Sequence, residues 1–190
     1  MTTISVVRKD GQIAIAADTL TKWGSGKESA KYIRNSEKII RIEDNFIAAT
    51  GNATFKMILK EYFTENSQSI SLQSVDDIFR TWNQLHLKLK EKYFLMPEED
   101  KEDAIESSRM DVIIANPHGI FGVSGHRTVQ EFTRFYAYGS GSDYALGSMF
   151  SSYESQKINA ETIARKSIEA AAEFDDGTGL PIDSFTVTAQ

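Results

Sequence analysis

Residues 2–18 read TTISVVRKDGQIAIAAD, and this stretch decides the fold. Two runs rich in β-branched and apolar residues, 2–8 and 12–17, flank the tripeptide Lys-Asp-Gly at 9–11. An Asp-Gly step between such runs is typical of a hairpin turn, because glycine adopts positive φ without steric cost. The second run is apolar on both faces, which is typical of a strand covered on both sides. We therefore predict an opening β-hairpin whose second strand is enclosed by two layers.

After this hairpin, the spacing of apolar residues along the chain is in turn typical of strands and of helices. After strands predicted at 38–42 and 46–50, apolar residues recur at the spacing of one helix face, namely Phe55, Ile58, Leu59, Tyr62 and Phe63. The further predicted elements are a helix over 78–89 preceded by a Ser74 N-cap, strands over 111–115, 120–123 and 132–138, helices over 142–153 and 159–174, and a strand over 184–188. Strand sets separated by helix pairs predict two sheets with helices outside, an α+β layered domain spanning residues 1–190.

The amino-acid composition and net charge of the chain argue against several classes of function. The 190 residues are 41% hydrophobic and 25% charged, which is ordinary for one globular domain. Cysteine is absent, so the chain has no disulfide, thiol nucleophile or thiolate metal site, and we expect a cytoplasmic protein. The net charge of −6 argues against nucleic acid or an anionic membrane as the main partner. The scattered histidines lack metal-ligand spacing, so neither a metal nor another cofactor is expected.

Thr2 is a candidate nucleophile if Met1 is removed. Methionine is readily removed before a small residue, and the product would carry a hydroxyl and a free α-amine on one residue. Such an amine has an unperturbed pKa near ~8 and can act as a general base near neutrality. A threonine activated by its own amine is a known form of the nucleophile–base pair. An exposed terminus without a role is the alternative interpretation of Met-Thr-Thr.

Two charged residues could support Thr2. Asp18 ends the second predicted strand, where a buried carboxylate needs a cationic partner, and Lys38 opens the third. A lysine beside Thr2 would lower the pKa of its hydroxyl and would favour the deprotonated amine, through repulsion of a second positive charge. Lys27 and Lys31 lie between them in the sequence and are alternative partners for Asp18.

Three glycine-containing turns complete the candidate site. Gly51 lies where a strand passes into a helix, and its backbone N–H suits a developing oxyanion because glycine permits close approach. Ser140 lies in Gly-Ser-Gly before a helix, and Asp175 and Thr178 lie in DDGTG after the last helix. Taken singly, each of these could be an ordinary turn.

In order, these segments resemble the proteasome β-subunit family, which includes the bacterial HslV peptidase. The resemblance rests on TTISVVRKDGQIAIAAD, KIIRI, FIAATGNA, YGSGSDYALG and ARKSIEAAAEFDDGTG, and it runs from Thr2 to about Thr188. Because the sequence opens directly on a strand-like run, without the extra N-terminal helical segment of α-subunits, we expect a β-like or HslV-like subunit. It closely resembles bacterial homologues of this family other than HslV itself. The resemblance implies a four-layer αββα sandwich of the N-terminal nucleophile hydrolase class.

The resemblance also implies a role for each candidate residue. Thr2 corresponds to the nucleophile, Asp18 and Lys38 to the charged pair beside it, and Gly51 to the oxyanion glycine. Ser140 corresponds to the serine of the Gly-Ser-Gly motif and Asp175 to the aspartate that orients the terminus. Thr178 stands where the family usually has a second serine. The implied substrate-pocket positions are Thr21, Ala49, Ala53 and Met57. Small Ala49 and flexible Met57 imply a roomy apolar pocket.

The implied activity is that of a threonine endopeptidase that hydrolyses peptides or unfolded proteins from within a homo-oligomer of stacked rings. An ATPase partner is left open. A small-amide hydrolase of the same fold is one alternative, and a non-catalytic ring or scaffold protein that keeps Met1 is another. The acidic segment PEEDKED at 97–103 resembles an insertion, and we expect it to be a solvated loop.

Overall fold

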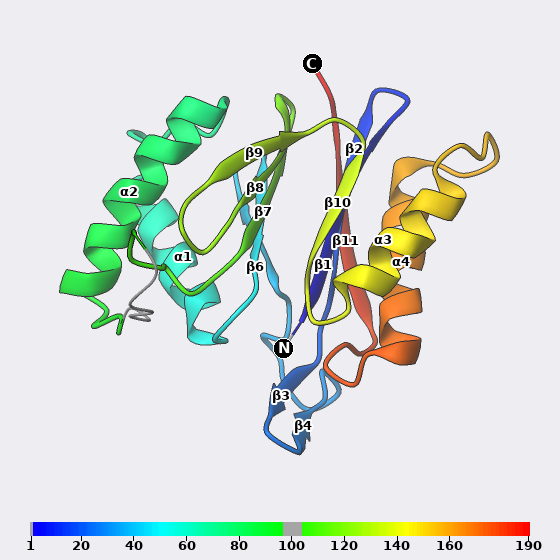
Figure 1. Ribbon diagram of the computed structural model, residues 1–190, viewed down its shortest axis with the longest axis horizontal. Coiled ribbons are helices and arrows are strands. Elements are labelled where there is room, and N and C mark those ends of the chain that lie inside the picture. Colours follow the sequence, from blue (N-terminus) through cyan, green and yellow to red (C-terminus); the bar gives the residue numbers. More distant parts are fainter. Residues whose placement is uncertain (1, 97–103) are drawn as a thin grey trace.

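Four layers make up the computed structural model, which describes residues 2–96 and 104–190 (Figure 1). Two β-sheets face each other, and each carries a pair of helices on its outer side (Figure 1). The predicted α+β class and the αββα sandwich are therefore confirmed. The predicted acidic loop at 97–103 lies outside the described residues.

Neighbouring strands are antiparallel throughout both sheets. The first sheet has the order β10 (Phe135–Gly139), β1 (Thr3–Lys9), β2 (Gln12–Asp18) and β11 (Ile182–Thr188). The second has the order β5 (Ile39–Ile42), β6 (Asn45–Ala49), β7 (Val112–Asn116), β8 (Gly119–Val123) and β9 (Val129–Phe132). The helices are α1 (Thr54–Glu65) and α2 (Val75–Glu91) outside the second sheet, and α3 (Ser142–Ser152) and α4 (Ala160–Phe174) outside the first (Figure 1).

Strand β2 shows why the opening hairpin specifies the layers. Ile13, Ile15 and Ala17 point into the core between the sheets, whereas Ala14 and Ala16 pack under α3 and α4. Successive side chains of a strand point to opposite faces, so a strand that is apolar on both faces requires a covering layer on each. The prediction of an enclosed second strand is confirmed.

The helices begin where their sequence signals predict. Ser74 accepts a hydrogen bond from the backbone N–H of Asp77 and caps α2, and Asn159 caps α4 in the same way through Thr162. The apolar face predicted for α1 is buried against the second sheet. In the described part of the chain, no helix combines the length and apolar character needed to cross a membrane.

The single strand predicted over 132–138 is wrong. The chain forms β9 up to Phe132 and β10 from Phe135, and these strands belong to different sheets. Aromatic side chains on both sides of the crossing fill the space between the sheets, and the rings of Phe132 and Tyr136 stack with centroids 4.2 Å apart. Because both halves are equally rich in strand-forming residues, the sequence pattern does not reveal the change of partner.

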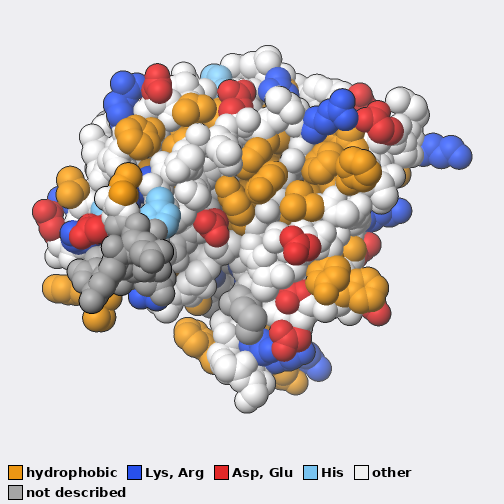
Figure 2. Space-filling view, in the orientation of Figure 1, with side chains coloured by type: hydrophobic (Ala, Val, Ile, Leu, Met, Phe, Trp, Pro, Cys, Tyr) orange, Lys and Arg blue, Asp and Glu red, His pale blue; other side chains and the backbone are white. Residues whose placement is uncertain are grey.

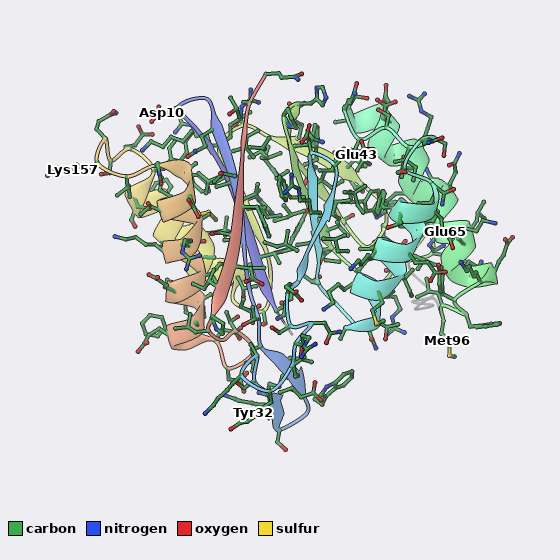
Figure 3. All side chains as sticks on the ribbon, turned by 180° about the vertical axis from the view of Figure 1, so that it is seen from behind. Asp10, Tyr32, Glu43, Glu65, Met96 and Lys157 are labelled. Carbon is green, nitrogen blue, oxygen red and sulfur yellow. The ribbon has the colours of Figure 1, made fainter. Side chains whose placement is uncertain are left out.

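A short hairpin that was not predicted projects below the sheets (Figure 1). It consists of β3 (Thr21–Trp23) and β4 (Gly26–Glu28), with Gly24 at a φ of +56° in the turn. Its polar, glycine-rich sequence gives no apolar alternation. Tyr32 follows it and points away from the layers at the lower end of the molecule (Figure 3).

Candidate active site

Asp18 joins the start of the chain to the opposite sheet. It is the last residue of β2 and is fully buried. Its Oδ1 accepts hydrogen bonds from the Thr2 hydroxyl at 2.7 Å and from the Lys38 Nζ at 2.8 Å. Lys38 immediately precedes β5, so this ion pair connects the two sheets at the edge where the chain begins (Figure 1). The structure therefore brings Thr2, Asp18 and Lys38 together.

Backbone groups complete the surroundings of the Asp18 carboxylate. The Thr3 N–H donates to Oδ1 at 3.0 Å, and the N–H groups of Leu20 and Gly179 each donate to Oδ2 at 3.1 Å. A buried carboxylate is tolerated only when its oxygens are paired and hydrogen-bonded, and both of these oxygens are. Asp18 is therefore a fixed anion around which Thr2 and Lys38 are oriented.

Lys38, rather than Lys27 or Lys31, is the cation that contacts Asp18, since the other two side chains are exposed. The Lys38 side chain is 13% exposed, and burial lowers its pKa from 10.5. The charge and hydrogen bond of Asp18 oppose that shift, and the charge of nearby Lys56 adds to it. Desolvation thus makes the ammonium easier to deprotonate than a surface lysine.

The second cluster lies beside Thr2 and centres on Asp175. The hydroxyls of Ser140 and Thr178 both donate to Asp175 Oδ2, at 2.7 and 2.5 Å. The Ser140 backbone N–H donates to the Thr2 carbonyl at 2.9 Å, and the Ser140 hydroxyl lies 3.5 Å from the same oxygen. Ser140, Asp175 and Thr178 are therefore together at the start of β1, as the sequence predicted that they would be.

Thr3 also belongs to this cluster, and the sequence reasoning missed it. Its Oγ1 lies 2.6 Å from Thr178 Oγ1 and accepts from the Gly141 N–H at 3.0 Å. Since the Thr178 proton goes to Asp175, the Thr3 hydroxyl donates to Thr178. A chain of hydrogen bonds thus runs from Gly141 to Asp175. The available signal was a threonine that alternates with Thr2 onto the opposite face of the strand.

Gly139 fixes the position of Thr2. It has a φ of +109°, and a Cβ added there would lie 1.9 Å from the Thr2 carbonyl oxygen. Thr3 pairs directly with Gly139 across the β1–β10 ladder. Only glycine permits this approach, so the turn that carries Ser140 is held against the first residues of the chain.

A cleft of about 110 Å³ lies in front of Thr2. It is lined by Thr2, Thr21, Lys22, Trp23, Ser36, Lys38, Ala49, Gly51, Asn52, Ala53 and Lys56. The predicted pocket residues Thr21, Ala49 and Ala53 therefore share the cleft with the nucleophile candidate. Gly51 reaches it with a φ of +96°, where a Cβ would lie 2.7 Å from the Arg109 carbonyl oxygen.

Met57 does not line this cleft. Its side chain is 63% exposed and borders a separate hollow of about 760 Å³ between α1, β5 and Phe185. The next residue back along α1, Lys56, lies at the cleft instead. The expected roomy apolar pocket is therefore replaced by a lining that includes Lys22, Lys38 and Lys56. A helix residue and its neighbour point in different directions, and the sequence alone did not fix which one faced the cleft.

This arrangement provides the parts of nucleophilic catalysis. A hydroxyl, an ammonium and a carboxylate are in contact, a backbone turn lies across the cleft, and a second carboxylate is close to the residue that would carry an α-amine. The described residues contain no grouping of three or more His, Cys, Asp or Glu side chains placed to hold a metal ion.

No family model matches the chain, but it is similar to several known proteins. The structure of Thiobacillus denitrificans BPH in complex with epoxomicin has a TM-score of 0.93 and 58% sequence identity, with 100% of both chains covered. HslV, an ATP-dependent protease subunit of Desulfovibrio desulfuricans, is 28% identical over 91% of this chain and 90% of its own. The proteasome subunit beta of Nanoarchaeum equitans is 24% identical over 99% of this chain and 93% of its own.

Proposed function

The chain belongs to the proteasome-type family of N-terminal nucleophile hydrolases, and on this premise we propose that it is a threonine endopeptidase whose nucleophile is Thr2. The contact of the Thr2 hydroxyl with Asp18, which also holds Lys38, is the observation that carries this proposal. Loss of Met1 would leave a hydroxyl and a free amine on one residue at the end of the cleft.

Proton transfer would begin at the Thr2 amine. With Met1 removed, the amine takes the hydroxyl proton directly or through a water. The Lys38 ammonium favours the alkoxide and the neutral amine by repelling further positive charge. Asp18 holds that ammonium in place. Asp175 and Ser140 would accept hydrogen bonds from the amine and orient it, a role supported by the hydrogen bond between them and by the contact of Ser140 with the Thr2 carbonyl.

Attack would follow across the cleft. The Thr2 Oγ1 forms a bond to the substrate carbonyl carbon, and the Gly51 N–H donates to the resulting oxyanion. Collapse breaks the peptide C–N bond, the departing amine takes a proton from the Thr2 amine, and an ester to Thr2 remains. Water then attacks that ester with the amine again acting as base, which releases the second product and restores Thr2.

The substrates and assembly are inferred from the same premise. We assign peptides or unfolded proteins as substrates, homo-oligomeric stacked rings as the assembly, and a bacterial cytoplasm as the location. A closed ring suits a chain that assembles with copies of itself. HslV is named as a subunit of an ATP-dependent protease, and an ATPase could serve this chain in the same way.

Peptide hydrolysis by matched Thr2 variants tests the proposal. The processed Thr2→Ala protein should lose turnover of fluorogenic peptides entirely, because no hydroxyl remains, while Thr2→Ser should keep part of it. Thermal melting should place both variants within a few degrees of the wild type. Undiminished hydrolysis by Thr2→Ala would refute the mechanism. Turnover of small N-acyl amides without any peptide turnover would favour the small-amide alternative instead.

A further inference from the structure

The cleft in front of Thr2 has an unbalanced charge. The side chains of Lys22, Lys38 and Lys56 line it, and the described lining contains no Asp or Glu. The lining includes residues of the β3–β4 hairpin, and Figure 2 shows Lys or Arg side chains, with acidic side chains beside them, at this projecting lower end of the molecule. The small side chains of Ala49 and Ala53 leave room between these cations.

The three lysines differ in how their charge is balanced. Lys38 is held by the fully buried Asp18 and serves the nucleophile. Lys22 pairs with Asp176, whose side chain is 74% exposed while that of Lys22 is 8% exposed. An exposed partner of this kind is screened by water and holds its cation weakly. Asp176 therefore offsets part of the Lys22 charge, and we expect Lys22 to contribute less to the positive potential of the cleft than Lys56 does.

The Lys56 ammonium makes hydrogen bonds, but these bonds do not neutralise its positive charge. Its Nζ donates to the carbonyl oxygens of Asn35 and Glu37 at 2.5 and 2.8 Å. Neutral carbonyls satisfy donors but carry no net charge. Burial lowers the pKa of Lys56, the charges of Glu37 and Asp183 oppose that shift, and Lys60 adds to it. A partly desolvated cation gains most from an anion that enters its neighbourhood.

We propose that this cleft selects peptides with an acidic side chain at the residue whose carbonyl Thr2 attacks, and that Lys56 and Lys22 determine this specificity. The assignment rests on the proposed peptidase function. Thr2 and Gly51 border the same cleft, so the side chain nearest the attacked carbonyl is the one that enters it. A glutamate carboxylate would sit among the ammonium groups, whereas an arginine would add a further positive charge and be repelled.

Peptides that differ at this one residue provide the direct test. The values of kcat/KM are compared for otherwise identical fluorogenic peptides with Glu, Gln, Leu or Arg before the scissile bond. Glu and Gln share shape and differ in charge, so their ratio isolates the electrostatic contribution. One charge-assisted contact predicts about a 10- to 100-fold preference for Glu over Gln. A Glu peptide that is cleaved no faster than its Gln counterpart would overturn the proposal.

Lysine variants then show which side chain causes the preference for the Glu peptide. Lys56→Met should reduce the Glu-to-Gln ratio at least several-fold, Lys22→Met should reduce it less, and Lys56→Glu should favour the Arg peptide. Lys60→Met is the matched control, because Lys60 lies one turn further along α1 and borders only the other hollow, whereas Lys56 borders both. If Lys56 only supported the 35–37 loop, Lys56→Met would lower kcat/KM for all four peptides equally and would leave the Glu-to-Gln ratio unchanged.

Covalent labelling separates failure of this proposal from failure of the proposed function. An epoxyketone peptide with a neutral side chain should still modify Thr2, but more slowly than its acidic counterpart. Equal labelling by the two probes refutes the acidic preference while leaving the threonine peptidase intact. The absence of any labelling or turnover would refute both.

Discussion

At the scale of single residues, Asp18 has the most demanding environment in the site. Its carboxylate is fully buried, and donors from β1, the loop after β2, the turn at Gly179 and Lys38 converge on it. Such a charge is stable only while these donors are present, and Lys38 equally depends on the carboxylate. The proposed catalysis and the stability of the fold therefore both depend on Asp18.

Replacing Asp18 by asparagine should damage stability as well as activity. The variant leaves the Lys38 ammonium without its anion and turns an amide NH₂ towards groups that donate, which should cost about 3–5 kcal/mol of unfolding free energy. Urea denaturation measures this cost. Glu154→Gln is the control, since its ion pair with Arg134 is exposed on both sides and its loss should leave the midpoint nearly unchanged. Equal midpoints for Asp18→Asn and the wild type would contradict this account.

The Thr178 hydroxyl should be needed, but its extra methyl group should not. Thr178→Val keeps the shape and removes the acceptor of the Thr3 hydroxyl, so one buried donor loses its partner and Asp175 loses a donor. We expect kcat to fall about tenfold, in line with a loss of about 1–3 kcal/mol, while Thr178→Ser stays close to the wild type. Steady-state kinetics of the two variants, measured side by side, test this prediction. Equal kcat values for Thr178→Val and Thr178→Ser would show that the hydrogen bonds from Thr3 through Thr178 to Asp175 play no part in the mechanism.

The pH profile should report Lys38. Peptidase activity should rise as the Thr2 amine loses its proton, at a pH below the ordinary ~8 of an α-amine, because the Lys38 charge favours the neutral amine. It should then fall as Lys38 deprotonates, and burial lowers the Lys38 pKa, so this fall should begin below pH 10.5. In Lys38→Arg the guanidinium stays charged, and the alkaline fall should disappear, whatever the maximal rate. An unchanged alkaline limb in that variant would assign the fall to another group.

Sequence reasoning identified the charged residues because strand ends limit where they can lie. Asp18 and Lys38 end and open predicted strands, and the structure places them in contact. Thr3 and Met57 show the limit of that reasoning. Their positions depend on which way a side chain points at the first residues of a strand and along a helix, and that direction is set by the packing of distant segments.

At the scale of structural elements, the turn from β6 into α1 controls the cleft. Gly51 has a φ of +96° and packs against the Arg109 carbonyl and the Phe55 ring. The backbone direction of its N–H thus depends on the segment before β7 as well as on the turn itself. Helices, caps and the first hairpin were predictable because each carries a local signal, whereas the division between β9 and β10 depends on pairing with distant strands.

Gly51→Ala should therefore displace the oxyanion donor. The added Cβ would lie 2.7 Å from the Arg109 oxygen, so the turn must shift, and we expect at least about a 100-fold loss of kcat. Gly24→Ala is the matched control: it also has positive φ, but a Cβ there meets nothing within 4 Å. Gly24→Ala should lose only about 1 kcal/mol of stability to backbone strain and should keep its activity. Stopped assays with a fluorogenic peptide compare the two, and a fully active Gly51→Ala would contradict the assigned role.

At the scale of the whole molecule, the two sheets meet at the site. Asp18 ends a strand of one sheet and Thr2 precedes another strand of it, whereas Lys38 and Gly51 adjoin the other sheet, so the proposed catalytic groups come together only when both sheets have packed (Figure 1). The apolar core between the sheets, with Ile4, Ile15 and Ile113, holds them in this relation.

The central claim is that Thr2 becomes a free N-terminal nucleophile, and intact mass spectrometry of the purified protein treated with an epoxyketone peptide tests it most directly. We predict a chain that has lost Met1 and gained one probe, with the adduct at Thr2 and none in the Thr2→Ala variant. A chain that keeps Met1 and gains no probe would contradict the account and would favour a non-catalytic ring or scaffold protein.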